Sequence, residues 1–135
     1  MLQKLNSKRG GFTLVEIMIV VAIIALLASI AVPNFLRSRK RSQATQVLED
    51  LRLIDAAVDQ YAIENNKKKD DSVAWADVQK YLKTGTRLEQ SAHLDVLGGD
   101  FGATYKVDTI PKVPTGTFNA LSDVAPTDFW GAHKP

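Results

Sequence analysis

The sequence predicts an α+β protein in which one long N-terminal helix carries a small antiparallel sheet packed on its second half. Three patterns predict this fold: an apolar stretch near the N-terminus, a helical stripe of apolar residues after it, and alternating residues beyond Gly98. A chain of 135 residues has room for one globular domain. We expect four segments, which are residues 1–11, 12–33, 34–66 and 67–135.

Residues 12–33 form the apolar stretch, in which 18 of 22 residues are apolar and Glu16 is the only charged one. A helix of about 20 apolar residues crosses about 30 Å of hydrocarbon. A buried core helix is one alternative, but the residues that follow are too few to cover it on every side. A secretory signal peptide is another, but its small-residue cleavage site would follow the apolar stretch, whereas Gly10 and Gly11 precede it. The stretch is therefore expected to span a membrane.

The net charge of +2 is the sum of segments that differ widely in charge. Residues 1–11 carry +3, residues 34–41 carry +4, and residues 42–135 carry −4. The basic cluster after the apolar stretch is expected to lie at the lipid headgroups, because long cationic side chains reach the membrane interface. Its alternative role is to pair with the acidic domain of another copy.

Pro33 interrupts an otherwise continuous helical pattern. Proline lacks a backbone N–H and clashes with the carbonyl four residues earlier, so it ends or bends a helix. Helical spacing resumes beyond it in one apolar stripe, which consists of Ala44, Val47, Leu51, Ile54, Val58 and Tyr61. We expect one helix from about Phe12 to Asn65, bent near Pro33, with a helix stop at Pro33-Asn34 as the alternative.

A short helix is expected after the long one. Ser72 is placed to cap it, Trp75, Val78 and Leu82 share one face, and Gly85 provides a C-terminal stop. Trp75 could serve as a ligand platform, but we expect it to pack on the stripe of the long helix.

The last third of the chain predicts short strands and turns. Phe101, Ala103, Tyr105 and Val107 alternate with polar or small residues, as in a half-buried strand. Residues 117–121 are expected to form another short strand, and the two prolines before it restrict the intervening stretch to an edge or a loop. A small antiparallel sheet of two to four strands results.

The segment KRGGFTLVE, which begins at Lys8, resembles the class III signal of type IV pilins and type II secretion pseudopilins. The likeness extends to Pro33. It implies that a membrane aspartyl prepilin peptidase cuts between Gly11 and Phe12 and methylates the new amine of Phe12. It also implies a cytoplasmic leader, residues 1–11, that is removed from a single-pass protein of the bacterial inner membrane. The outer domain is then periplasmic, or extracellular after assembly.

Glu16 is expected to have two roles. The spacing Thr13-x-x-Glu16 fits a capping box, in which the two side chains close the first turn of a helix. A carboxylate inside an apolar segment is costly and marks a candidate functional site. The resemblance implies that Glu16 pairs with the Phe12 amine of a neighbouring subunit during assembly. It also implies that the stretch marked by Pro33 can unwind in a filament.

No catalytic constellation is present in the sequence, so no enzyme activity is expected. The chain has no cysteine, and two histidines, His93 and His133, are too few for most imidazole-rich metal sites. Three lysines at residues 67–69 are followed by two aspartates, which favours a solvated turn over nucleic-acid binding. No nucleic-acid partner is expected.

No cofactor is expected, and calcium is the alternative. Major pseudopilins often stabilise the corresponding C-terminal loop with calcium, and here Asp123 and Asp128 flank residues 124–127. Calcium takes about six to eight oxygen ligands, which this loop does not supply, so we expect ordinary turn aspartates. The missing cysteines exclude the disulfide that closes this region in many major type IV pilins.

The resemblance implies a structural subunit of an inner-membrane-derived helical filament, and the absence of cysteine favours a type II secretion pseudopilin. Its expected partners are further copies, related minor subunits, the prepilin peptidase, the inner-membrane assembly platform and, before assembly, the lipid bilayer. One alternative is a type IV pilus subunit that serves adhesion, motility or DNA uptake. A membrane-anchored monomeric binding protein is the other.

Overall fold

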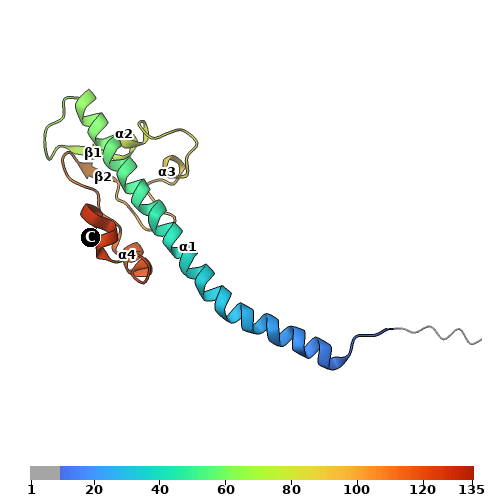
Figure 1. Cartoon of the computed structure of the whole chain (residues 1–135). Coiled ribbons are helices and arrows are strands. Elements are labelled where there is room, and N and C mark those ends of the chain that lie inside the picture. Colours follow the sequence, from blue (N-terminus) through green and yellow to red (C-terminus); the bar gives the residue numbers. More distant parts are fainter. Residues whose placement is uncertain (1–9) are drawn as a thin grey trace, which may run out of the picture. The chain divides into compact units, whose positions relative to one another are not determined.

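The structure, a computed structural model, describes residues 10–135, so the predicted leader lies outside it except for its last two residues. The chain divides into two compact units, Met1–Leu36 and Arg37–Pro135. We call the second unit the head. Helix α1, Leu14–Glu64, supplies the described helical part of the first unit and the longest element of the head (Figure 1).

Helix α1 agrees with the predicted helix to within two residues at each end. It continues past Pro33, so the alternative of a helix stop at this proline is wrong. The helix ends because Asn66 adopts a left-handed backbone with φ of 50°, and the Lys67 N–H donates to the Ala62 carbonyl at 2.9 Å. The three lysines that follow are exposed in a turn, as predicted.

The apolar stripe of α1 forms one side of the core of the head. Five of its six predicted members are buried, and Tyr61 packs against the core while partly exposed. The α1 residues of the core are Ala44, Val47, Leu48, Leu51, Ile54, Ala57, Val58 and Ala62. This packing confirms the prediction that α1 carries the remainder of the head on one face.

The sheet has two antiparallel strands, β1 (Ser72–Ala74) and β2 (Thr104–Lys106), with Val73 opposite Tyr105. The α+β class is confirmed. The predicted strand over 101–107 is shorter in the structure, because Gly102 with φ of 99° breaks the extended run. Ala103 is exposed, whereas the other three alternating residues are buried.

Helix α2, Trp75–Gln79, follows β1 directly, so the prediction that Ser72 caps it is wrong. The extended backbone of β1 lets Val73 enter the core, where it is 1% exposed. Trp75 is buried as expected and lies 6.4 Å from the Tyr105 ring, measured between centroids. Gly85, with φ of 83°, lies in a later turn and does not end the helix.

Residues 117–121 belong to a helix and not to the predicted strand. Helix α4 spans Thr115–Leu121, and its buried residues Thr117 and Leu121 are four apart, as on one helical face. The Phe118 N–H donates to the Pro114 carbonyl at 2.9 Å, which starts the first turn.

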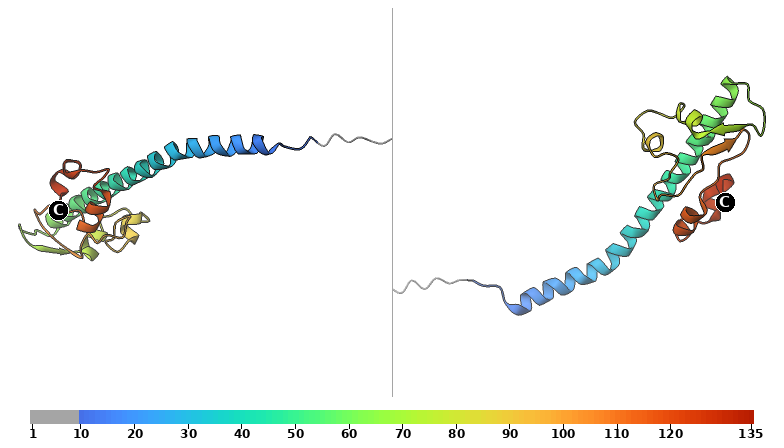
Figure 2. Two further views of the ribbon diagram at one scale, coloured as in Figure 1. Left: turned by 90° about the horizontal axis from the view of Figure 1, so that it is seen from below. Right: turned by 180° about the vertical axis from the view of Figure 1, so that it is seen from behind.

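The remaining elements of the head are short. They are α3 (Arg87–Gln90), α5 (Thr127–Trp130) and a 3-10 turn at Gly131–His133. Two views show α4 beside the part of α1 that begins the head, whereas β1, β2 and α2 lie beside its C-terminal part (Figures 1 and 2). Trp130 from α5 is 1% exposed and donates through Nε1 to the Ala125 carbonyl, which joins the last segment to the core.

Candidate functional site

The first turn of α1 is closed by two reciprocal hydrogen bonds between Thr13 and Glu16. The Glu16 N–H donates to Thr13 Oγ1 at 3.1 Å, and the Thr13 N–H donates to Glu16 Oε2 at 3.3 Å. These are the two bonds of a capping box, so that prediction is confirmed. The carboxylate also lies in the first turn, where the positive end of the helix dipole favours it.

The Glu16 carboxylate keeps an unused acceptor. Within residues 10–135, only the Thr13 N–H donates to it, and Oε1 accepts no hydrogen bond. The residue is exposed along with the whole of the first turn. The carboxylate is thus free to accept a cation from outside the chain while it still caps the helix.

Gly11 and Phe12 lie in irregular backbone before α1, and both are exposed, Phe12 to 83%. A Cβ atom built on Gly11 meets nothing within 4 Å. Packing among the described residues therefore does not explain why glycine occupies this position. Cleavage between the two residues stays a prediction.

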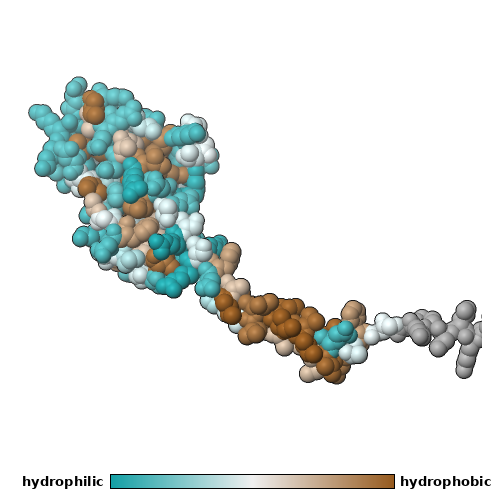
Figure 3. Space-filling model, in the orientation of Figure 1, coloured by the Kyte–Doolittle hydropathy of each residue, from teal (hydrophilic) through white to brown (hydrophobic). Residues whose placement is uncertain are grey.

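The segment from Phe12 to Leu36 exposes more than a dozen large apolar side chains, each between 47% and 83% exposed. Its surface is almost continuously hydrophobic in Figure 3. Burying one such side chain yields about 1.5–3 kcal/mol, so the total far exceeds the 5–15 kcal/mol stability of a typical domain. Of the described helices, α1 alone is long and apolar enough to cross a membrane. This surface requires hydrocarbon or other apolar helices around it.

Pro33 lies inside α1, where it cannot donate a backbone hydrogen bond to the Ser29 carbonyl. The Ser29 hydroxyl donates to the Leu26 carbonyl at 2.6 Å, which is a local bond within the same helix. The backbone around the proline is therefore held by one helical hydrogen bond fewer than its neighbours. Its unwinding in a filament stays a prediction.

The basic cluster at the start of the head contains Arg37, Arg39, Lys40 and Arg41. Lys40 Nζ forms an ion pair with Asp123 Oδ2 at 3.0 Å, and about half of each side chain is exposed. One of the four cations is thus paired within its own chain, a contact that sequence analysis did not foresee.

The ion pair predicts a shift in the titration of Asp123. The hydrogen bond and charge of Lys40 hold the pKa of Asp123 below its ordinary value. Because the charged form is favoured, the pair persists above this lowered pKa and is lost as the pH falls through it. Lys40→Met is expected to raise the pKa, as measured by NMR titration of the full chain in detergent micelles. Arg39→Met is the control, and equal curves for Lys40→Met and the parent would contradict the pairing.

The two calcium candidates have different surroundings. Asp123 binds Lys40, whereas Asp128 is exposed in the first turn of α5. Over the described chain, no group of three or more His, Cys, Asp or Glu side chains is placed to hold a metal ion. Among the described residues, Asp123 and Asp128 therefore belong to no such cluster of three.

The two histidines bind separate neighbours. His93 Nδ1 lies 2.7 Å from Asp100 Oδ1, and His133 Nδ1 lies 2.9 Å from the Pro111 carbonyl oxygen. Both contacts link nearby loops of the head, and the His93 ring also meets the Trp75 ring edge-on, 5.9 Å between centroids. They act as packing residues.

A partly buried ion pair between Asp50 and Arg87 links α1 to α3, and sequence analysis missed it. Asp50 is 6% exposed, and Arg87 also donates to the Leu94 carbonyl at 3.1 Å. Burial raises the pKa of Asp50, and the Arg87 guanidinium opposes this shift. The available signal was the position of Asp50, which lies between Val47 and Ile54 on the apolar stripe.

Asp95 organises a second buried polar site that the sequence did not reveal. The residue is 5% exposed, and its Oδ1 accepts the N–H groups of Leu97 at 2.7 Å and Gly99 at 2.8 Å. Its Oδ2 accepts the Thr117 hydroxyl. A Cβ on residue 99 would overlap both the Thr117 hydroxyl and this carboxylate, so the loop needs glycine there.

Comparisons with known proteins agree with this geometry. A family model described as "Prokaryotic N-terminal methylation motif" matches residues 6–32. The type IV major fimbrial protein FimA of Dichelobacter nodosus is 37% identical over 106 residues, which are 78% of this chain and 68% of that protein. The chain belongs to the type IV pilin-like family. Wherever it begins, an alignment of this length includes most of the head.

Other members of the pilin-like family resemble this chain over a shorter span. The type II secretion system core protein G of Klebsiella pneumoniae is 37% identical over 45% of this chain, and that of Aeromonas hydrophila is 33% identical over 46%. The chain spans 44% and 43% of their respective lengths, less than half of each. No solved structure matches. The family is one of structural subunits, and the apolar helix fits a membrane-anchored member.

Proposed function

We propose that this chain is a structural subunit of a helical filament drawn from the bacterial inner membrane, as the pseudopilin of a type II secretion system. The observation that carries the proposal is the start of α1. A capped glutamate with an unused carboxylate oxygen stands on a helix that exposes apolar side chains all round. Helices of this kind are stable in a bilayer or in a bundle of their own copies.

Assembly would begin with processing. A prepilin peptidase would cut between Gly11 and Phe12 and methylate the Phe12 amine, which becomes a cation four residues before Glu16. The match of the methylation motif over residues 6–32 supports this step. The leader would lie in the cytoplasm and the head in the periplasm, or outside the cell after assembly. An inner-membrane assembly platform would then move the subunit from the bilayer into a filament with related minor subunits.

Two observations favour a pseudopilin. Relatives named type II secretion system core protein G occur in several bacteria, among them Escherichia coli and Vibrio cholerae. The chain also lacks the cysteines that would form a C-terminal disulfide. The proposed role requires neither catalysis nor a cofactor, because the subunit acts through packing. Calcium at Asp123 and Asp128 is the less favoured proposal, since Lys40 already neutralises Asp123.

The second candidate is a subunit of a type IV pilus. The FimA match favours it, because it covers 78% of this chain against 45% for the Klebsiella core protein G. The type IV major pilin protein PilA of Myxococcus xanthus is also similar, at 39% identity over half of the chain. Both candidates require the same assembly chemistry at residues 12–16.

Deletion of the gene distinguishes a type II secretion pseudopilin from a type IV pilus subunit. A pseudopilin predicts that exported proteins are retained in the periplasm while sheared surface filaments are unchanged. Restoring the intact gene should reverse the defect, and a copy with Glu16→Gln should not. Loss of surface filaments with normal export would support the pilus subunit instead. Normal export together with normal filaments would contradict both and leave a membrane-anchored monomer.

A further inference from the structure

One face of α1 remains uncovered within the head. Its exposed positions include Leu53, Ala56, Gln60 and Ile63, which recur at spacings of three and four along the helix. Ile63 is 78% exposed and Leu53 is 52% exposed, and these are the two most exposed large apolar side chains of the head. A helix face that carries such residues in water gains from being covered.

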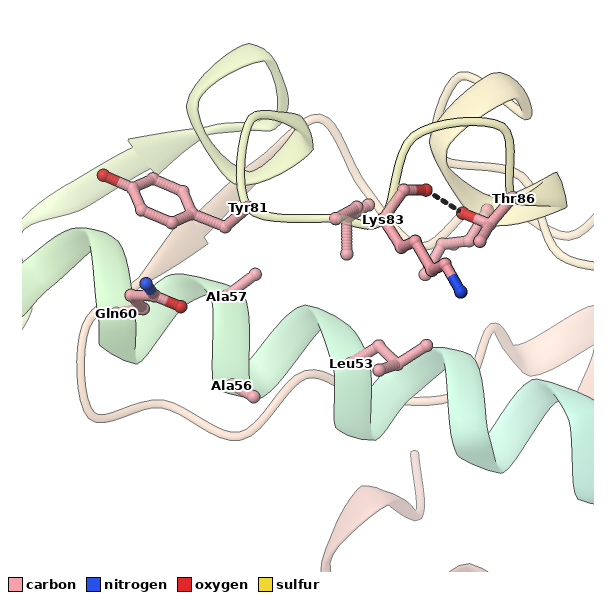
Figure 4. Close-up of a pocket in the computed structure, with 9 residues that line it drawn as sticks. Leu53, Ala56, Ala57, Gln60, Tyr81, Lys83 and Thr86 are labelled. Atoms are coloured by element: carbon pink, nitrogen blue, oxygen red, sulfur yellow. Dashed lines mark hydrogen bonds between the residues drawn. The ribbon is translucent and has the colours of Figure 1, made fainter.

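A groove of about 230 Å³ lies on one flank of this face, between α1 and the loop that joins α2 to α3. Figure 4 shows Leu53 and Ala57 of α1 on the side that faces Tyr81 and Lys83 of the loop. Its floor is apolar. The volume suffices for a branched aliphatic side chain such as isoleucine.

Ile63 lies on the opposite flank of the same face. It lines a different depression together with Asp59, which lies one turn earlier in α1, and with Lys67 and Lys69 from the following turn. Asp59 forms no ion pair with any residue of the described chain, and neither does Lys83 at the groove. Ile63 thus lies beside the unpaired acid Asp59, and the groove lies beside the unpaired base Lys83.

We infer that this groove receives Ile63 of a second copy of the chain, with Asp59 of that copy facing Lys83. The inference rests on the proposed filament function, because membrane insertion then makes all copies parallel. Ile63 and Ala56 are two turns apart, so the second copy would be displaced by about 10 Å along the helix axis. The projecting Ile63 and the groove are different surfaces of the head, so each copy can contact one copy through Ile63 and another through its groove. Such a contact between unlike surfaces repeats from copy to copy without closing, as a filament requires.

Cysteine cross-linking tests this contact, because the natural chain has no cysteine. The full chain with Ala56→Cys and Ile63→Cys together should give a ladder of disulfide-linked multimers in oxidised cell envelopes of the native host, detected with an antibody to the head. The two sites are about 10 Å apart within one helix, beyond the limit of about 7 Å for a disulfide, so every bond joins two copies. The matched control pairs Ala56→Cys with Ile110→Cys, another exposed side chain of the head, and should stay monomeric.

A charge exchange tests the same contact without cysteine. Asp59→Lys should lower filament yield at least several-fold, because it brings two cations together, and Lys83→Asp in the same chain should restore it. Filaments without a ladder and without this rescue would overturn the inference while leaving the proposed function intact. Dimers from Ala56→Cys alone, or its cross-link to a different protein, would also overturn it. Failure of the unaltered chain to form filaments in its native host would instead contradict the proposed function.

Discussion

Filaments are expected to be lost when Glu16 is replaced by glutamine, while the chain is still inserted and processed. Glutamine preserves the capping box, since its amide oxygen accepts the Thr13 N–H as the carboxylate does. It cannot neutralise the Phe12 amine of a neighbouring copy. Leaving such a charge unpaired in an apolar environment costs about 3–5 kcal/mol, which corresponds to more than a hundredfold loss in association. The measurement is the number of filaments that contain this chain, isolated from lysed cells with an antibody to the head and counted by electron microscopy.

Thr13→Ala is the matched control for Glu16→Gln. It removes the acceptor of the Glu16 N–H and weakens the first turn by about 1 kcal/mol, but it keeps the charge. Filament yield should therefore remain close to that of the parent. Mass spectrometry of both variants should show the cut between Gly11 and Phe12 and the added methyl group. Normal filaments from Glu16→Gln would disprove the ion-pair role of this residue.

Replacing Asp95 with alanine should destabilise the head by about 3 kcal/mol or more. The change leaves three donors, the N–H groups of Leu97 and Gly99 and the Thr117 hydroxyl, without their acceptor in a buried site. Each unsatisfied buried polar group costs about 1–3 kcal/mol. Both tryptophans of the chain are buried in the head, so their fluorescence during denaturation in detergent micelles reports on this unit.

Asp95→Asn tests whether hydrogen bonding or charge stabilises this loop, because it removes the charge at nearly constant side-chain size. Its amide oxygen accepts the same two backbone N–H groups, and its NH₂ group donates to the Thr117 oxygen. The loss should then be less than half of that for alanine. Equal loss in both variants would show that the charge, and not the hydrogen-bonding pattern, stabilises this loop.

The sequence predicts α1 well because local and tertiary preferences coincide along it. The apolar stretch, the capping box and the stripe from Ala44 to Val58 each depend on spacing within one helix. The turn after Glu64 is also local, since asparagine at residue 66 tolerates a left-handed backbone. These features require no knowledge of the rest of the chain.

The head was harder to predict because its short elements depend on distant contacts. Strand β1 is extended because Val73 pairs with Tyr105, more than 30 residues later, and nothing local distinguishes it from a helix N-terminus. Residues 117–121 show the reverse error, because the inward-facing residue Thr117 is polar and its hydroxyl donates to Asp95. A prediction based on hydrophobicity does not expect a polar residue at a buried position of a helix.

The polar contacts also differ in how far apart in sequence their partners lie. The arrangement at Thr13 and Glu16 lies within four residues, so its geometry could be predicted and was found. The ion pairs of Lys40 with Asp123 and of Asp50 with Arg87 join residues 83 and 37 positions apart. Only the folded chain shows which of several charged residues become partners.

The exposed apolar surface of residues 12–36 also determines the route by which subunits would reach a growing filament. A copy that left the bilayer alone would bring more than a dozen large apolar side chains into water, at about 1.5–3 kcal/mol each. In the proposed assembly the dissolved pool of subunits would therefore be essentially empty, and subunits would reach the filament by lateral diffusion in the membrane. Growth rate should accordingly follow the number of subunits per area of membrane, so that a cell regulates elongation by surface density and not by bulk concentration.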